Sequence, residues 1–175
     1  KLKGKAKELE RILAKIMGGT QKSVSLDKST EEKSGEFLGQ GLSMFKKALS
    51  FPVKGKILQK FGKQKHEEYS DILFIKGLEI SATIGARVKA IADGKVVLSQ
   101  NLPAYGNLII IDHGERYYSL YGRLATTFKT VGDFVKARED LAILGETDYK
   151  GRNFYFELRV LGKAIDPLEY FKDPP

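Results

Sequence analysis

Apolar residues near the N-terminus recur every three or four positions, the spacing that places side chains on one face of a helix. They are Leu2, Ala6, Leu9, Leu13 and Ile16. This spacing is typical of an amphipathic helix and of a coiled-coil seam, and Gly18-Gly19 predicts its end. About two heptads are too few to be stable alone. We therefore expect residues 1–19 to be the end of a longer coiled coil, or a helix that docks on its own domain or on a partner.

Residues 20–50 predict a linker and a second, weaker helix. Residues 20–36 are polar, without an aromatic residue or a period, and predict a flexible linker. A second apolar stripe then predicts a short amphipathic helix over 37–50. Its members are Leu38, Leu42, Phe45 and Leu49. Gly39 and Gly41 each cost a helix about 1 kcal/mol relative to alanine, so we expect this helix to dock in a groove.

From residue 51 the pattern changes to short runs rich in β-branched and aromatic residues, separated by glycine turns. The runs are KILQKFG, DILFIKGLEI, ARVKAIADGKVVLSQ, NLIIIDHG, RYYSLYGRL, DFVKAREDLAILG and NFYFELRV. Asp93-Gly94, between two alternating runs, predicts a two-residue hairpin. Seven or more strands without a long internal helix predict one mainly β domain over 51–173, a sandwich or barrel-like fold.

Composition narrows the choice of partners. The net charge is +8, and 11 of the 30 basic residues but only 6 of the 22 acidic ones lie in the first 50 positions. A basic helix suits nucleic acid, an anionic membrane surface or an acidic protein, but the chain has no DNA- or RNA-reading motif, and we expect no nucleic-acid partner. The sequence lacks cysteine, which excludes disulfides and thiolate metal sites. It has no run of 18 apolar residues, and it starts at Lys1 without a signal segment, as an excised fragment would.

Four motifs of the β region carry a resemblance to a known family. They are FIKGLEIS (74–81), IIIDHG (109–114), YSLYGRL (118–124) and NFYFELRV (153–160). With the glycines and apolar residues between them, they resemble the LytM domain of the lysostaphin-type zinc endopeptidases, which cut peptidoglycan cross-bridges. The resemblance covers about residues 52–171. It implies an antiparallel LytM β-fold with a groove along one face.

The same resemblance implies that the zinc site of the family is lost here. The metal histidines fall on Ile75 and Tyr155, the metal aspartate on Glu79, and the catalytic histidines on Arg123 and Asn153. Zinc needs three nitrogen, sulfur or oxygen donors and an open position for water. Isoleucine offers no donor, tyrosine is a poor one, and a nearby arginine repels the ion. We therefore expect no catalytic residue, no bound metal and no other cofactor.

We expect the former peptidase groove to bind a partner instead. Its candidate residues are Lys76, Tyr105, Tyr121, Arg123, Tyr155 and Arg159. Tyrosine and arginine are enriched at binding hot spots, and strand alternation places Asn153, Tyr155, Glu157 and Arg159 on one side of their strand. Three of these assignments have alternatives: Tyr121 as a core tyrosine, Lys76 as a solvated lysine, and Arg123 as the ion-pair partner of Glu79.

Within the family, the K-G-L-E-I, S-L-Y-G and F-Y-F-E-L-R segments resemble the degenerate, EnvC-like branch of murein hydrolase activators. That resemblance implies a non-enzymatic activator of N-acetylmuramoyl-L-alanine amidases in cell division and daughter-cell separation, located in the periplasm or cell envelope. The amidase's regulatory helix would bind the groove. An N-terminal coiled coil would bind a membrane division complex of the transporter-like type.

The predicted helix at 37–49, or a segment near it, would then occupy the groove and hold the protein inactive. Two other functions stay open at this point. In one, the groove is a peptidoglycan-binding module in which Lys76, Arg123 and Arg159 pair with stem-peptide carboxylates. In the other, a residual zinc endopeptidase is rebuilt from His66, Glu79 and His113, which requires the loop histidine to swing inward.

Overall fold

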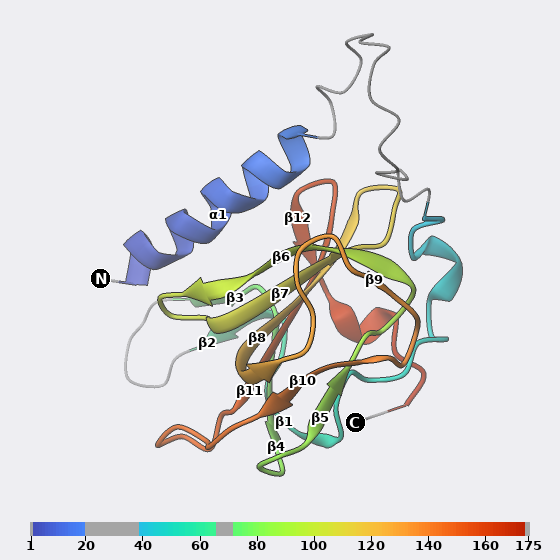
Figure 1. The fold of residues 1–175 in the computed structure, drawn as a ribbon. Coiled ribbons are helices and arrows are strands. Elements are labelled where there is room, and N and C mark those ends of the chain that lie inside the picture. The colour runs from blue at the N-terminus through green and yellow to red at the C-terminus, as the bar shows by residue number, and fades with distance from the viewer. Residues whose placement is uncertain (1, 20–38, 66–71, 174–175) are drawn as a thin grey trace, which may run out of the picture.

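A single α-helix lies across a mainly antiparallel β domain in the part of the chain that the computed structural model describes, residues 2–19, 39–65 and 72–173 (Figure 1). The helix is α1 (Leu2–Gly19), and two short 3-10 helices are η1 (Ser43–Phe45) and η2 (Pro167–Glu169). The strands of the first half are β1 (Gly55–Gln59), β2 (Gly62–Lys65), β3 (Ile72–Ile75), β4 (Leu78–Ala82), β5 (Arg87–Lys89) and β6 (Gly94–Leu102). Those of the second half are β7 (Gly106–Asp112), β8 (Tyr117–Thr127), β9 (Phe134–Val135), β10 (Asp140–Leu144), β11 (Phe154–Val160) and β12 (Lys163–Ile165).

Ten of the described strands form one strongly curved sheet. Along its main path the order is β1-β4-β11-β8-β7-β6-β9, while β10 pairs with β5 and β8, and β12 extends β11. The remaining two, β2 and β3, form a separate hairpin. All of these strand pairs are antiparallel. The expected antiparallel β-fold is confirmed.

The two faces of the central strands carry two separate hydrophobic clusters, because successive side chains of a strand point to opposite faces. On β7, Ile109 and Ile111 belong to the main core. Their neighbours Leu108 and Ile110 belong to a second cluster on the other face. The second cluster also contains Leu98, Leu102, Tyr118 and Leu120 from β6 and β8, and Leu9 and Leu13 from α1.

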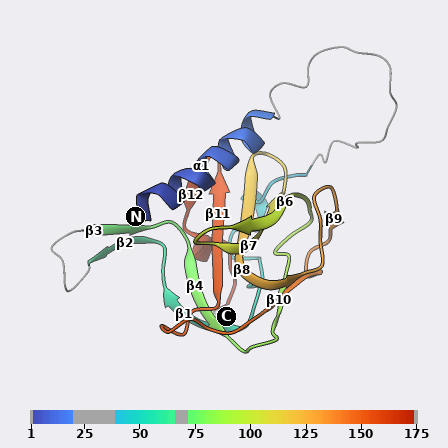
Figure 2. The same cartoon turned by 60° about the vertical axis from the view of Figure 1, so that its left-hand side comes forward.

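The helix α1 covers this second cluster (Figure 2). Leu9 and Leu13 are 1% and 2% exposed, whereas Lys7, Glu8, Arg11 and Lys15 point to solvent. Burying two leucines contributes roughly 3–6 kcal/mol relative to leaving them in water, enough to hold a helix of this length that is marginal alone. Of the alternatives for residues 1–19, the structure shows a helix docked on its own domain, ending at Gly19 as predicted.

The segment expected to form an amphipathic helix over 37–50 does not form one over its described residues. It contains only the three-residue η1, and its positive φ at Gly41 and Lys47 interrupts any helix. Leu42 and Leu49 are buried in the main core, and Leu49 bridges to Phe171. Residues 39–50 therefore belong to the body of the domain, and the expected linker 20–36 lies outside the described residues.

The hairpin predicted at Asp93-Gly94 is also not formed. Strand β5 pairs with β10, whereas β6 pairs with β7 and β9. The Asp93 carboxylate accepts a hydrogen bond from the Ala137 amide at 2.7 Å, and the Asp93 carbonyl lies 2.8 Å from His113 Nδ1. Asp93 thus holds two distant segments together instead of closing a tight turn.

Candidate functional site

The candidate site is the face of the sheet that α1 covers. We call it the α1-covered face and define it by Leu98, Leu108, Ile110, Leu120, Tyr155 and Arg159. Its apolar part is the second hydrophobic cluster, and its polar part is the outer face of β11. Tyr105 lies between the two parts, because it packs against the second cluster and its ring centroid is 5.8 Å from that of Tyr155.

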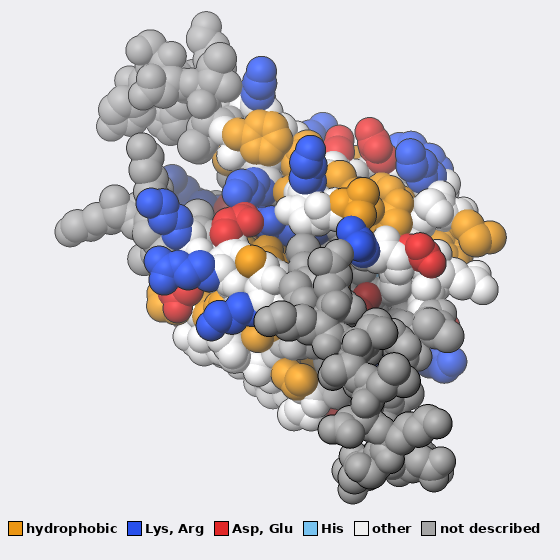
Figure 3. All heavy atoms as spheres, turned by 90° about the horizontal axis from the view of Figure 1, so that it is seen from above, with side chains coloured by type: hydrophobic (Ala, Val, Ile, Leu, Met, Phe, Trp, Pro, Cys, Tyr) orange, Lys and Arg blue, Asp and Glu red, His pale blue; other side chains and the backbone are white. Residues whose placement is uncertain are grey.

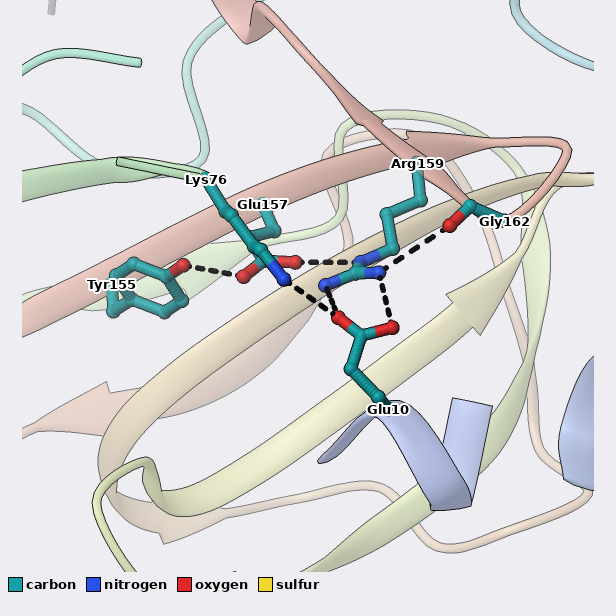
Figure 4. A network of polar contacts seen from close by, with 6 residues as sticks. All are labelled: Glu10, Lys76, Tyr155, Glu157, Arg159 and Gly162. Atoms are coloured by element: carbon teal, nitrogen blue, oxygen red, sulfur yellow. Dashed lines mark hydrogen bonds and ion pairs between the residues drawn. The ribbon is translucent and has the colours of Figure 1, made fainter. Parts of the chain in front are cut away.

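A continuous chain of polar contacts runs along β11 and onto α1 (Figure 4). The Tyr155 hydroxyl donates to Glu157 Oε1 at 2.5 Å, and Arg159 Nε donates to Glu157 Oε2 at 2.8 Å. These residues alternate on one strand, so all three side chains lie on the same face. Gly77 permits this crowding, because a Cβ there would lie 2.3 Å from the Phe156 carbonyl and 2.9 Å from the Tyr155 hydroxyl.

Glu10 of α1 completes this chain from the opposite side. Arg159 binds its carboxylate through two nitrogens, at 2.9 and 3.2 Å, and Lys76 Nζ lies 3.0 Å from Glu10 Oε1. The four charged groups balance, because two cations meet two carboxylates. We call the contact of Glu10 with Arg159 and Lys76 the Glu10 clamp.

The charges of the clamp are stabilised by one another. Burial raises the pKa of Glu10, but the hydrogen bonds from Arg159 and Lys76 outweigh it and hold the pKa below its ordinary value. Burial lowers the pKa of Arg159, yet the nearby Glu157 and Glu10 carboxylates raise it overall. Burial, together with Glu157, raises the pKa of Tyr155 and brings that of Tyr105 to about 12. Both tyrosines therefore remain protonated donors.

A second charged cluster lies at the positions to which the resemblance in the sequence assigns a metal site. Arg123 Nη2 donates to Glu79 Oε1 at 3.0 Å, which is the ion pair considered in the sequence analysis. Arg152 Nη1 lies 3.1 Å from Glu79 Oε2, which is close enough for an ion pair but is not aligned for a hydrogen bond. Arg152 also forms an ion pair with Asp148 at 2.9 Å. Arg123 stacks its guanidinium 5.7 Å from the centre of the Tyr155 ring.

These residues do not fit a zinc ion. Glu79 is held between two guanidinium groups, and the Tyr155 hydroxyl is already hydrogen-bonded to Glu157. Ile75 has no donor atom. Two cations at this point would repel a divalent ion. The described residues contain no group of three histidine, cysteine, aspartate or glutamate side chains able to hold a metal.

The alternative zinc site is not assembled around His113 either. This histidine is buried on the main-core side, with Nδ1 at 2.8 Å from the Asp93 carbonyl and Nε2 at 2.6 Å from Ser119 Oγ. Its two ring nitrogens are therefore both engaged. Glu79 lies in the ion pairs just described, and His66 lies outside the described residues.

Most of the residues predicted for the groove do lie together. Lys76, Tyr105, Arg123, Tyr155 and Arg159 surround the polar part of the α1-covered face. However, Tyr155 is only 9% and Arg159 only 2% exposed while α1 is docked. Lys76 binds Glu10 and is not a merely solvated lysine.

Tyr121 was wrongly predicted to line the groove. It is fully buried in the main core, and its hydroxyl accepts a hydrogen bond from the Ile91 amide at 3.1 Å and lies 2.9 Å from Ser119 Oγ. Asn153 is also structural, because its amide group donates to the Ala82 carbonyl and accepts from the Ala82 amide, each at 2.9 Å.

The reason for the error at Tyr121 is a bulge in β8. Two residues apart on a regular strand, Tyr121 and Arg123 would share a face. In the structure, β8 has one extra residue where it pairs with β7. Asn107 faces Leu124 and Ile109 faces Tyr121, so two steps along β7 correspond to three along β8. Arg123 has a positive φ of 61°, and this bulge turns its side chain toward Glu79.

Sequence reasoning missed Glu10 and Arg152 as site residues. Glu10 is 149 positions from its partner Arg159, and its place beside Leu9 on the helix was the one available signal. Arg152 precedes the NFYFELRV motif in a turn without periodicity. Glu157, which strand alternation placed on the same side as Tyr155 and Arg159, connects these two residues.

The exposed surface around α1 is mixed in character. Seen from above, Lys and Arg side chains are spread over it among hydrophobic groups and a few acidic ones (Figure 3). Over residues 7–16, where the side chains of α1 are described, its exposed charged residues are three cations and one acid: Lys7, Arg11, Lys15 and Glu8. No described helix is long and apolar enough to cross a membrane.

The fold agrees with the comparisons to known proteins. The model of peptidase family M23 matches residues 73–167, more than half of the chain. The chain therefore belongs to peptidase family M23. A solved zinc-containing peptidase from Vibrio cholerae aligns with a TM-score of 0.63 and 28% identity, over 75% of this chain and 40% of that one.

Within that family, the curated relatives it matches include proteins named as activators. The chain is 34% identical to the murein hydrolase activator EnvC of Escherichia coli, over 93% of its own length and 38% of the relative's. It is 36% identical to the murein hydrolase activator NlpD of the same species, over 69% of this chain and 30% of that one. The chain thus spans less than two-fifths of these relatives.

Proposed function

We propose that this chain is a non-enzymatic activator of peptidoglycan amidases, and that the α1-covered face is its amidase-binding surface. The observation that carries the proposal is that this face already binds an amphipathic helix. Helix docking into an apolar surface is a common mode of peptide recognition, and an amidase's regulatory helix would take the place of α1. The names of the relatives EnvC and NlpD support the activator role.

In this proposal the chain has no hydrolytic activity of its own. The residues at the former metal and catalytic positions are an isoleucine, a glutamate in two ion pairs, an arginine, an asparagine bound to backbone and a tyrosine bound to Glu157. None of them is free to hold zinc or to activate water. This donor set supports binding and argues against a residual endopeptidase.

The docked α1 makes this an inhibited state. Leu9 and Leu13 fill the apolar part of the face, and Glu10 pairs with its two cations. An amidase helix must displace all of these contacts. The predicted autoinhibitory segment is therefore α1 in our proposal, and not residues 37–49, which are built into the domain.

Release of α1 requires a second signal, which we assign to a membrane division complex of the transporter-like type acting on the N-terminal helical region. We also place the chain in the periplasm or cell envelope. The matched relatives that support this location include an outer membrane antigenic lipoprotein of Haemophilus influenzae, 35% identical over 69% of this chain. The chain covers only 28% of that relative.

The peptidoglycan-binding alternative has less support at this face. Arg159 and Lys76 are paired with Glu10, and Arg123 is paired with Glu79. Stem-peptide carboxylates would have to compete with these two carboxylates of the chain itself. An amphipathic helix carrying one acidic residue fits the observed contacts better.

The test is a dye-release assay on labelled sacculi with a purified amidase. Leu9→Asp combined with Leu13→Asp in the intact chain should free α1, because two charges cannot remain in the second cluster. We expect little stimulation by the unmodified chain and at least about tenfold more by this variant, since a docking loss of 1.4 kcal/mol already changes an equilibrium tenfold. Lys7→Asp with Lys15→Asp is the matched control on the exposed side of α1.

Two results would count against the proposal. If the freed variant leaves the amidase at its basal rate, while circular dichroism shows an intact β domain, the α1-covered face is not the activating surface. If the chain releases dye without any amidase, it is an enzyme and the activator role falls.

A further inference from the structure

A second, separate concavity lies at the far end of the domain from α1. It has a volume of about 790 Å³ and is formed by the segment 50–54, the β4–β5 turn with β5, Arg138 and the C-terminal residues Lys172 and Asp173. In both ribbon views the C-terminal end of the chain lies away from α1 (Figures 1 and 2). We call this concavity the basal cleft.

The basal cleft is rich in positive charge. Its lining contains Lys54, Arg87, Lys89, Arg138 and Lys172. Asp140 neutralises part of this charge, since it lies 2.7 Å from Arg87 and 2.6 Å from Lys89. Lys54 and Lys172 have no ion-pair partner among the described residues, and the lining carboxylate is Asp173.

The floor of the cleft is apolar and firmly held. Pro52, Val53 and Ala86 line it. The segment 50–54 is fixed by a hydrogen bond from the Lys89 amide to the Pro52 carbonyl and by one from Arg138 Nη1 to the Phe51 carbonyl, each at 2.8 Å. The Phe51 ring also stacks on Phe171 with a centroid distance of 4.1 Å. The cleft is therefore preformed.

We propose that the basal cleft binds peptidoglycan through the carboxylates of its stem peptides. The volume lies in the range of roughly 300–1,000 Å³ that is usual for small-ligand sites. Cations around the rim suit carboxylates, and the small apolar floor suits the methyl groups of alanine residues in a stem. A hollow of this shape favours a short branched ligand over a flat phospholipid surface.

This site is independent of the α1-covered face. None of its lining residues belongs to the second hydrophobic cluster or to the Glu10 clamp. The protein would therefore be held on the cell wall whether α1 is docked or free. The inference rests on the proposed function only in taking peptidoglycan as the surface on which the chain works.

The experiment is co-sedimentation of the full chain with purified sacculi at low ionic strength. The test variant is Lys54→Gln with Lys172→Gln, which removes the two unpaired cations of the rim. The control is Lys56→Gln with Lys63→Gln, two exposed lysines outside the cleft. We expect about tenfold weaker binding for the test variant, because two charge-assisted contacts are lost, and a small change for the control.

Two further arms identify the ligand. Sacculi whose stem peptides have been removed should no longer retain the chain. Vesicles containing anionic phospholipid should retain it poorly compared with intact sacculi. Equal binding of the test and control variants, undiminished binding to stripped sacculi, or preference for the vesicles would each overturn the inference.

The same variants in the dye-release assay, made on the background with α1 freed, separate this inference from the proposed function. At a chain concentration that saturates the stimulation, dye release should be unaffected by Lys54→Gln with Lys172→Gln, because both residues lie outside the α1-covered face. If sedimentation with sacculi depends on the two cleft lysines but the amidase is not stimulated, the activator role is contradicted and the binding role of the cleft stands. If the amidase is stimulated but sedimentation does not depend on the two lysines, the activator role stands and the binding role of the cleft is contradicted.

Discussion

Arg159 forms ion pairs with two carboxylates, one on its own strand and one on α1. Glu157 lies on the same strand and is 1% exposed, so its contact with Arg159 belongs to the folded domain. Glu10 lies on α1, and its contact with Arg159 lasts only while the helix is docked. In the proposed state without docked α1, the guanidinium keeps Glu157 and the Gly162 carbonyl as partners and presents its remaining donors outward. A residue of this kind can support the fold and bind a partner at once.

This double role predicts a large difference between the two cations of the Glu10 clamp. Arg159→Met should cost about 3–5 kcal/mol of unfolding free energy, because it leaves the buried Glu157 charge unpaired. Lys76→Met should cost less than about 1 kcal/mol, since its ion pair with Glu10 is largely exposed. Urea denaturation of the two variants measures both.

Adding Glu157→Gln to Arg159→Met provides the check on this reasoning. Because Glu157→Gln removes the carboxylate charge that Arg159→Met leaves unpaired, it should restore part of the lost unfolding free energy. Equal stabilities of Arg159→Met and Lys76→Met would mean that Glu157 does not depend on Arg159.

At the scale of single residues, the sequence predicts which side chains stand in the motifs but not which partners they contact. The residues Ile75, Arg123 and Tyr155 can be read directly from the motifs, and their chemistry is the reason to expect no zinc ligand set there. The partners that stabilise the new side chains cannot be read in this way. Arg152 and Glu10 reach the site from elements far away in the sequence, and only the tertiary fold brings them there.

At the scale of elements, the periodic patterns predicted helix α1 and the β-rich runs, because each reflects burial of one face. The patterns failed where a local feature overrides periodicity. The bulge in β8 moved Tyr121 to the core, and the glycines at 39–41 allowed residues 39–50 to follow the domain surface as irregular chain. The stripe of Leu42 and Leu49 was correctly read as buried, but not as part of the main core.

The turn between β7 and β8 is tied to the rest of the domain through His113. Its ring connects the Asp93 carbonyl to Ser119, and Ser119 connects onward to the Tyr121 hydroxyl and the Ile91 amide. Burial lowers the pKa of His113 to about 4, although the contacts with Asp93 oppose the change. The folded protein therefore keeps this histidine neutral where the unfolded chain, with a pKa near 6.5, takes up a proton.

Stability should consequently fall as the pH drops from 7 to 5. The unfolded state gains a proton in this window and the native state does not, which lowers the unfolding free energy by about 2 kcal/mol. Urea denaturation at the two pH values measures the change. His113→Gln should be less stable at pH 7 but should lose much less between pH 7 and pH 5. An unmodified chain with the same stability at both values would contradict the buried, neutral histidine.

The whole molecule combines a helix-binding face that is covered, a cluster of ion pairs around Glu79, and a basal cleft that is open. On the first of these, α1 docks through Leu9, Leu13 and Glu10. Sequence alone predicted the fold, but the choice of α1 as the docked segment required the three-dimensional contacts.

The most direct measurement is a competition for the α1-covered face. A fluorescent peptide of the amidase's regulatory helix is titrated with the Leu9→Asp, Leu13→Asp chain, and unlabelled peptides of residues 1–19 are then added. We predict that the natural peptide displaces the amidase helix, and that the same peptide with Glu10→Gln displaces it several-fold less well, because it lacks the carboxylate that Arg159 and Lys76 bind. If the amidase helix binds tightly and a saturating concentration of the natural peptide does not displace it, the two helices use different surfaces and the account is wrong.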